Sequence, residues 1–425
     1  MSAEEDVAPL LRPEGWALLQ QLPPYDASAA LALGARLRAA GTPAPVVAAA
    51  QTQSRLRAQA RDKLGPFADD MLFTADGLEQ ATRLPVAARH ADRLRRAGAT
   101  RVADLGCGIG VDALAMAGMG LAVEAVEQDE ATAAVATVNL RHLPRARVHL
   151  GDALDFPDGF PLAAPGEPDG VDAVWADPAR RLGGRRLFDP ETWSPPLSWA
   201  LALAGSGVSS VGIKVAPGVE RDLVAPGGPA AGWTAAWTSV DGDVVEAVLW
   251  WGAAATPGVS RSATLLRSVR GAGGEDAGAV QVQEVGTLTD ADLEVPAVGE
   301  VGEVFLEPDG AVIRAGLVGH VATQVGGRLL DPTIAFVTAD EHVPTPFARS
   351  YAVRTVMPFG LKRLRSYLRE QGVGRVVVKR RGNPVDPDQL RRSLRLDGGG
   401  GEATVVLTRQ GSARVVLVVD PLPGV

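Results

Sequence analysis

The spacing of apolar residues first divides the chain into a helical beginning and a mixed region. Residues 1–77 contain polar and apolar segments of helical period, which prolines and glycines near 23–24 and 41–45 separate. A further helix is predicted near 78–97 and leads into the first apolar strand. The apolar residues that share one face of this helix are Leu84, Ala88, Ala91 and Leu94. We therefore expect an N-terminal helical region over 1–77, followed by an α/β domain.

Apolar strands alternate with helical segments between residues 101 and 251. This alternation predicts an α/β fold with a doubly wound, Rossmann-like parallel sheet. The last two strands, near 233–240 and 244–251, are separated by Asp241-Gly242-Asp243, a sequence typical of a hairpin turn. Such a hairpin would add an antiparallel edge to the sheet. We assign residues 78–255 to this domain.

The rest of the chain is predicted to form a connector and a small α+β module. Residues 256–345 are interrupted by glycine and proline, so we expect a connector with short strands and a helix near 311–321. Residues 346–425 alternate in the order α-β-α-β-β and end in a hairpin formed by 404–407 and 413–419.

Charge is distributed unevenly along the chain. The whole protein has a net charge of −8, whereas residues 354–395 hold twelve basic residues against three acidic ones. Such asymmetry is typical of a nucleic-acid-binding surface on an acidic body, and also of a solvated helix face. The candidate RNA-binding residues in this segment are Lys362, Arg363, Lys379, Arg380 and Arg381.

A glycine-rich turn follows the first strand of the α/β domain, in the sequence Val-Ala-Asp-Leu-Gly-Cys-Gly-Ile-Gly that ends at Gly110. Glycine at alternate positions lets the backbone turn sharply and leaves its amides open to a ligand. The second strand ends at Glu127, about 20 residues beyond the first glycine, the spacing expected of an acid that binds ribose hydroxyls. The first and third strands end near Asp104 and Asp152, so three strand ends carry acids.

These acids distinguish between cofactors. Asp104 precedes the glycine turn, where it would repel a pyrophosphate, and Val111 stands where a dinucleotide motif has its third glycine. The turn resembles the first motif of class I S-adenosylmethionine-dependent methyltransferases, in which an acid and one further residue precede GxGxG. The resemblance implies S-adenosylmethionine as the cofactor. The cofactor-binding residues that it implies are Asp104, Gly106, Gly108, Gly110, Glu127, Asp152 and Ala153.

The fourth strand ends in Asp177-Pro178-Ala179-Arg180. Amino-group methyltransferases of this class carry a D/N-P-P-aromatic box there, and the present sequence is nearer to the Asp-Pro-Pro-Arg of some RNA methyltransferases. The resemblance implies that Asp177 and the Pro178 carbonyl orient the acceptor. Arg180 and Arg181 begin an arginine-rich loop that suits phosphate oxygens or is simply solvated.

Two further catalytic candidates are Lys214, near the end of the fifth strand, and Glu246, on a late strand. Ribose 2′-O-methyltransferases of the same fold use a Lys-Asp-Lys-Glu set, in which a lysine of lowered pKa takes the hydroxyl proton. Asp177, Lys214 and Glu246 match three members of that set. The alternative is a lysine on an edge strand or in a structural ion pair.

Other functional classes are disfavoured. The single cysteine, Cys107, lies inside the glycine turn and is expected to be a small buried filler, and the five histidines lack zinc-ligand spacing, so we expect no metal. No apolar stretch predicts a membrane span, and the acidic N-terminus does not resemble a signal peptide. These features predict a cytoplasmic protein that does not bind a membrane.

Segments 358–365 and 378–387 resemble the THUMP-like C-terminal domain of certain bacterial methyltransferases. THUMP domains proper bind RNA, although they usually precede the catalytic domain. Together the two resemblances imply an S-adenosylmethionine-dependent methyltransferase that acts on a nucleotide of a structured RNA such as tRNA or rRNA. The alternatives are a methyltransferase with a small-molecule or protein acceptor, and a non-catalytic protein that binds S-adenosylmethionine and RNA.

Overall fold

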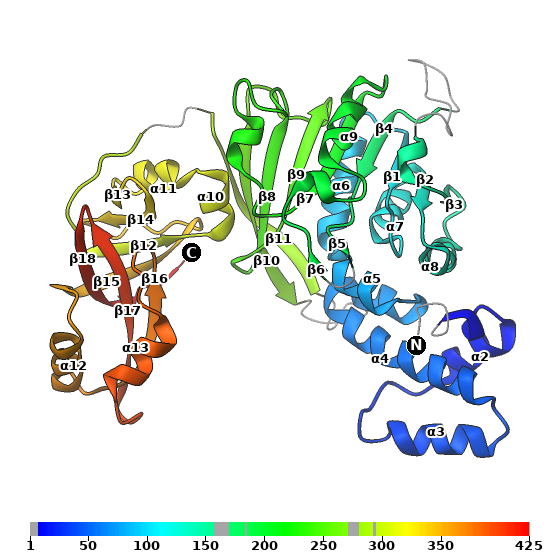
Figure 1. The fold of residues 1–425 in the computed structure, drawn as a ribbon, viewed down its shortest axis with the longest axis horizontal. Helices are drawn as coiled ribbons and strands as arrows, with labels where there is room; N and C mark the ends of the chain where they lie inside the picture. The colour runs from blue at the N-terminus through cyan, green and yellow to red at the C-terminus, as the bar shows by residue number, and fades with distance from the viewer. Residues whose placement is uncertain (1–6, 157–169, 183–184, 271–279, 292–294, 425) are drawn as a thin grey trace.

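The computed structural model contains a nine-stranded and a seven-stranded β-sheet that lie side by side, with a group of N-terminal helices below the larger one (Figure 1). The residues that the structure describes are 7–156, 170–182, 185–270, 280–291 and 295–424. Within these ranges, none of the helices combines the length and apolar character that crossing a bilayer requires.

The N-terminal helices share their core with the first strands of the larger sheet. They are α2 (Pro13–Gln21), α3 (Ala30–Ala39), α4 (Ala44–Leu64), α5 (Ala75–Gln80) and α6 (Leu84–Arg96). Leu56, Leu64 and Phe73 are buried in one cluster with Val102 and Met116, which belong to the α/β domain. The helical region therefore packs as part of the α/β domain.

The expected continuous helix over 78–97 is wrong, because the chain leaves the helical conformation between α5 and α6. Pro85 has no N–H to donate to the carbonyl of Ala81, so a helix cannot continue through this point. The Ala81 carbonyl instead accepts a hydrogen bond from Lys63 Nζ at 3.2 Å. The break places Thr82 in the interior, where its side chain is buried, and leaves Arg83 half-buried.

The larger sheet is doubly wound and has nine strands in the order β11-β10-β8-β9-β7-β4-β1-β2-β3. Its strands are β1 (Arg101–Leu105), β2 (Ala122–Glu127), β3 (Ala146–Leu150), β4 (Ala173–Ala176), β7 (Ser210–Val215), β8 (Thr234–Val240), β9 (Asp243–Gly252), β10 (Arg261–Arg270) and β11 (Val280–Thr289). Between these strands lie α7 (Val111–Gly118), α8 (Glu130–Leu140), α9 (Leu197–Ala202) and the two-stranded ribbon of β5 (Arg181–Leu182) and β6 (Arg185–Arg186).

The parallel strands and the antiparallel hairpin of this sheet confirm the sequence prediction. β3, β2, β1, β4 and β7 are mutually parallel, and β9 pairs antiparallel with both β7 and β8. Asp241 and Gly242 both have positive φ, as a tight hairpin turn requires. The carboxyl ends of the parallel strands consequently meet along one edge of the sheet, where open α/β sheets bind ligands.

The smaller sheet has seven strands in the order β13-β14-β12-β15-β18-β17-β16. Its strands are β12 (Val304–Pro308), β13 (Arg328–Asp331), β14 (Ile334–Ala339), β15 (Ala348–Pro358), β16 (Val373–Arg380), β17 (Gly401–Gln410) and β18 (Ala413–Pro421). The helices of this half are α10 (Gly310–Ala315), α11 (Val318–Gln324), α12 (Leu361–Glu370) and α13 (Pro387–Leu394).

Residues 256–345 differ from the expected connector. β10 and β11 extend the larger sheet, and β12 pairs with β15 so that β12 to β14 belong to the smaller one. The helix expected over 311–321 is divided into α10 and α11, because Gly316 adopts φ +73° and ends the first of them. In the C-terminal module the predicted α-β-α-β-β order is confirmed, but strand β15 was missed because a register shift at Val353 interrupts its alternation.

Candidate functional site

The glycine turn forms a bare backbone cradle between β1 and α7. Gly106, Gly108 and Gly110 all have positive φ, a conformation that side chains disfavour. A Cβ atom on Gly106 would lie 3.0 Å from the carbonyl oxygen of Asp177, whereas one on Gly108 would meet no atom within 4 Å. The turn therefore approaches the fourth strand end closely at Gly106 and faces open space at Gly108.

A cavity lies against this cradle and is lined by residues from the first four strand ends. The predicted cofactor residues that line it are Gly106, Gly108, Glu127, Asp152 and Ala153. Glu127 accepts hydrogen bonds from the amides of Gly108 at 3.0 Å and Asp129 at 2.9 Å, and its burial raises its pKa. Asp152 accepts from the amide of Leu154 at 2.9 Å. Both carboxylates are thus fixed beside the cavity by main-chain donors.

Asp104 and Gly110 lie outside the residues that line the cavity. Gly110 begins α7, and its α-carbon faces Ala136 and Leu140 of α8. Asp104 is only 1% exposed, and neither of its carboxylate oxygens has a hydrogen-bond partner among the described residues. Its burial, followed by the negative charges of Asp112 and Asp177, raises its pKa well above the usual value. Asp104 consequently lies behind the glycine turn.

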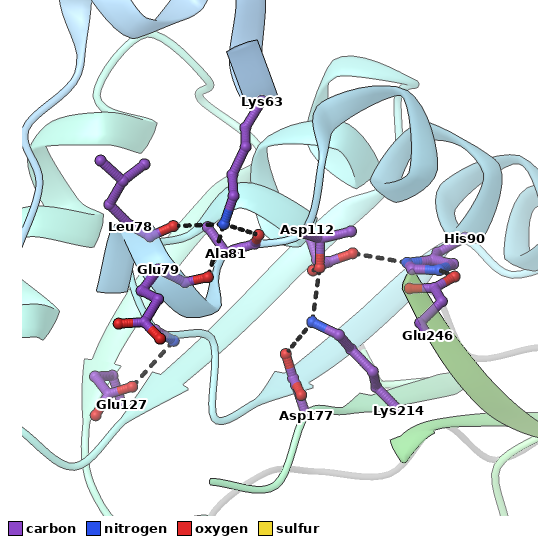
Figure 2. A network of polar contacts seen from close by, with 12 residues as sticks. Lys63, Leu78, Glu79, Ala81, His90, Asp112, Glu127, Asp177, Lys214 and Glu246 are labelled. Atoms are coloured by element: carbon purple, nitrogen blue, oxygen red, sulfur yellow. Dashed lines mark hydrogen bonds and ion pairs between the residues drawn. The ribbon is translucent and has the colours of Figure 1, made fainter. Parts of the chain in front are cut away.

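Asp177, at the end of β4, belongs to a buried chain of polar side chains (Figure 2). Lys214 Nζ, on the central strand β7, lies 2.8 Å from Asp177 Oδ2 and donates to Thr82 Oγ1 at 2.9 Å. Thr82 in turn donates to Asp112 Oδ2 at 2.8 Å. This chain joins the break between α5 and α6 to the ends of two central strands.

His90 continues the polar chain to Glu246. Its Nδ1 lies 2.8 Å from Asp112 Oδ1, its Nε2 lies 2.8 Å from Glu246 Oε1, and its ring stacks on Trp175 at 4.3 Å. Burial opposes the protonated form of His90, but the two carboxylates outweigh burial and raise its pKa to about 9. His90 is therefore a cation near neutral pH, and both ring nitrogens donate.

Lys214 is also a cation, unlike the lysine of lowered pKa in the ribose 2′-O-methyltransferase set. Its burial opposes protonation, but the negative charges of Asp177, Asp112 and Glu246 outweigh burial and raise its pKa. Its strand, β7, lies between β4 and β9 in the sheet. Of the roles that the sequence allowed for Lys214, the geometry fits that of a structural ion pair.

Sequence reasoning missed three members of this network: Thr82, His90 and Asp112. Thr82 was hidden inside a predicted helix, and only Pro85 indicated the break. His90 is a lone histidine on the apolar face of α6, a position that usually indicates a core residue. Asp112 follows the glycine turn in the first turn of α7, and its burial was the feature that the sequence did not show.

Some of the predicted RNA-binding side chains are exposed, and others contact neighbouring side chains. Lys362, Arg363 and Arg380 are exposed. Lys379 lies 2.5 Å from Glu307 and 5.5 Å from the centre of the Tyr351 ring, and Arg381 lies over the Phe336 ring. Arg180 lines the cofactor cavity, and the side chain of Arg181 falls outside the described part of the chain. Pro178 also lines that cavity.

No group of three or more histidine, cysteine or acidic side chains in the described ranges has an arrangement that could hold a metal ion.

The raised pKa of His90 predicts a pH-dependent contribution to stability. Because the folded-state value of about 9 exceeds the unfolded value of 6.5, the contribution is complete below pH 6.5 and is lost as the pH rises through about 9. The difference in free energy of unfolding between wild type and His90→Gln should therefore decrease by roughly 3 kcal/mol over that range. Thermal unfolding from pH 6 to pH 10 measures it.

The control for this experiment is His142→Gln, because the His142 side chain is 71% exposed. That variant should follow the wild type at every pH. A stability difference for His90→Gln that stays constant from pH 6 to pH 10 would contradict a charged His90.

Comparison with known proteins identifies a matching domain family and two relatives of this chain. Residues 348–421 match a family described as THUMP domain-like, and residues 4–60 match a domain of unknown function. Two Mycobacterium tuberculosis proteins, from strains CDC 1551 and H37Rv, are each named an uncharacterized S-adenosylmethionine-dependent methyltransferase. Each is 35% identical to this chain over 363 residues, which cover 84% of this chain and 91% of the relative.

The fold is similar to the crystal structure of a methyltransferase from Porphyromonas gingivalis W83, with a TM-score of 0.67 and 20% sequence identity. The match covers 94% of this chain and 100% of the other. The chain therefore belongs to the S-adenosylmethionine-dependent methyltransferases, uses S-adenosylmethionine as its cofactor, and carries a THUMP-like domain at its C-terminus.

Proposed function

We propose that this methyltransferase modifies a nucleotide of a structured RNA, with the acceptor held at Asp177. The observation that carries the proposal is the contact between the cofactor cradle and the fourth strand end, where the Gly106 α-carbon and the Asp177 carbonyl leave no room for a side chain. A molecule bound at Asp177 consequently lies next to whatever the glycine turn holds.

The cofactor residues fit S-adenosylmethionine by their chemistry. We assign its ribose to Glu127 and its adenine to Asp152 and Ala153, with the methionine end along Gly106 and Gly108. The carboxylates accept from hydroxyl and amino groups, and the open space at Gly108 admits a ligand against the backbone. Asp104 lies outside the lining of the cavity, and we assign it no contact with the cofactor.

Asp177 is arranged to bind a hydrogen-bond donor. Lys214 engages Oδ2, and the Asp177 side chain is 25% exposed, so Oδ1 is the oxygen we assign to an acceptor N–H or O–H. The Pro178 carbonyl supplies a second acceptor beside it. Lys214 stays protonated, because its pKa is raised, and therefore holds the carboxylate in place and does not remove a proton. Glu246 bonds to His90 and its negative charge favours protonated Lys214, so we assign it the role of a positioning residue.

Positioning accounts for most of the catalysis in this proposal. The bound cofactor supplies a methyl group on a sulfonium, which is a good leaving group. The protein must align the acceptor atom with that methyl group, and alignment of this kind contributes up to about 7–11 kcal/mol. The buried network from Glu246 to Lys214 fixes the orientation of Asp177 before the acceptor arrives.

RNA is the proposed acceptor because of the C-terminal half. Its THUMP-like domain and the exposed Lys362, Arg363 and Arg380 supply a basic surface that suits phosphate oxygens. Nucleoside mass spectrometry of total RNA, from cells with and without this gene, tests the proposal. One methylated nucleoside should be absent without the gene and restored by the wild-type protein, and unchanged nucleosides in every RNA class would contradict it.

Substitution of the cradle glycine Gly106 should weaken cofactor binding. In Gly106→Ala the new Cβ meets the Asp177 carbonyl, and φ +81° disfavours a side chain, so the turn must move. Strain of this kind costs about 1–3 kcal/mol, which predicts a Kd for S-adenosylmethionine raised about tenfold or more. Calorimetric titration measures the Kd.

Gly118→Ala is the matched control, because that glycine ends α7 and a Cβ there meets no atom within 4 Å. It should bind S-adenosylmethionine as the wild type does. Equal affinity of Gly106→Ala and wild type would place the cofactor elsewhere.

Asp177→Ala should slow methyl transfer while cofactor binding remains. Alanine removes the oxygens that hold the acceptor donor, so the transfer rate should fall about 100-fold or more. Asp222→Ala, at an exposed position beyond β7, serves as the control and should retain full activity. Wild-type rates of transfer in Asp177→Ala, measured with labelled S-adenosylmethionine, would remove Asp177 from the mechanism.

A further inference from the structure

A second cavity opens beside the cofactor cavity. The charged side chains that line it are Lys63, Glu79, Arg83, Arg180, Lys214 and Glu246. Gln80, Ala81, Thr82 and Arg180 line both cavities, so the two meet at the break between α5 and α6 and at the loop after Asp177. A ligand in the second cavity would therefore lie next to the acceptor position.

Two of its positive charges are already used inside the protein. Lys214 pairs with Asp177, and Lys63 Nζ donates to the carbonyls of Leu78 at 2.8 Å, Glu79 at 2.7 Å and Ala81 at 3.2 Å (Figure 2). Lys63 thereby closes the end of α5, as a cation at a helix C-terminus does, and it keeps its positive charge toward the cavity.

Arg83 and Arg180 have fewer polar contacts inside the protein. Arg83 donates to the carbonyl oxygen of Asp62 at 3.3 Å. Among the described residues, no carboxylate lies within ion-pair distance of either guanidinium. Burial lowers the pKa of Lys63, the neighbouring charges of Arg83 and Lys214 lower it further, and Glu79 raises it, so four cationic and two acidic side chains share this cavity. An anion bound there would relieve that repulsion.

We propose that Arg83 and Arg180 bind a phosphate group of the acceptor in this second cavity, so that the acceptor is recognised as a nucleotide. Guanidinium groups suit phosphate because they donate two parallel hydrogen bonds to its oxygens. Arg180 follows Asp177 by three residues, so a phosphate on Arg180 leaves the attached ribose or base within reach of Asp177. The inference rests on the proposed function and extends it to the substrate class.

The first test compares nucleotides with nucleosides. The four ribonucleoside 5′- and 3′-monophosphates and their parent nucleosides are titrated into wild-type protein saturated with S-adenosylhomocysteine. At least one monophosphate should bind about tenfold or more tightly than its nucleoside, as charge-assisted hydrogen bonds imply. Arg83→Ala/Arg180→Ala should lose that preference and keep its affinity for S-adenosylhomocysteine. The absence of a phosphate preference in the wild type, or its survival in the double variant, would overturn the proposal.

The matched control is Arg95→Ala/Arg96→Ala. These arginines lie at the other end of α6, and their side chains are 53% and 76% exposed. The control also removes two positive charges, so it corrects for the change in net charge. It should keep the phosphate preference of the wild type.

A second test uses methyl transfer to RNA taken from cells that lack this gene. Arg83→Ala/Arg180→Ala should lower kcat/KM about tenfold or more relative to both wild type and control. Transfer that is equal in the double variant and lost in Asp177→Ala would refute the phosphate site and leave the proposed function standing. If wild type methylates none of this RNA but still prefers nucleotides, the proposed RNA substrate fails and the phosphate site remains.

Discussion

The buried ammonium group of Lys214 is the constraint on which the site depends. An ion removed from water is costly unless other charges and hydrogen bonds compensate, and here Asp177, Asp112 and Thr82 do so. Asp112 in turn requires His90, and His90 requires Glu246. Each side chain supplies a hydrogen bond or an opposite charge to the next, so the network holds β4, β7, β9, α6 and α7 in one arrangement. The position of Asp177 beside the glycine turn follows from that arrangement.

Part of this organisation could be predicted from the sequence because it is local. The sheet and its ligand-binding edge could be inferred from local sequence features. These features are the strands that end in acids, the alternate glycines and the Asp-Gly-Asp turn. The network could not, because Thr82, His90 and Asp112 come from separate elements and meet only after folding. Lys214 shows the same limit: its sequence context left both a catalytic base and a structural ion pair open, and the three carboxylates that raise its pKa come together only in the folded chain.

The connection between the two sheets shows why residues 256–345 were misjudged as a connector. α10 packs on the larger sheet, where Ala311 and Val312 share a buried cluster with Ala235 and Leu265. The short apolar segments of residues 256–345 pack on both sheets, so no single hydrophobic periodicity dominates this part of the sequence. This shared core fixes the THUMP-like half relative to the catalytic half. The distance between Asp177 and the basic surface of Lys362, Arg363 and Arg380 is therefore fixed. A molecule that contacts both must match that distance.

The proposed function thus depends on one edge of the sheet, where the glycine turn, Asp177 and the positively charged side chains of the second cavity lie close together. A crystal structure of the protein with S-adenosylhomocysteine tests that arrangement most directly. The sulfur should lie against Gly106 and face Asp177, the ribose should contact Glu127, and Lys214 should stay bonded to Asp177. A ligand bound with its sulfur directed away from Asp177, or a Lys214 side chain released from that carboxylate, would contradict it.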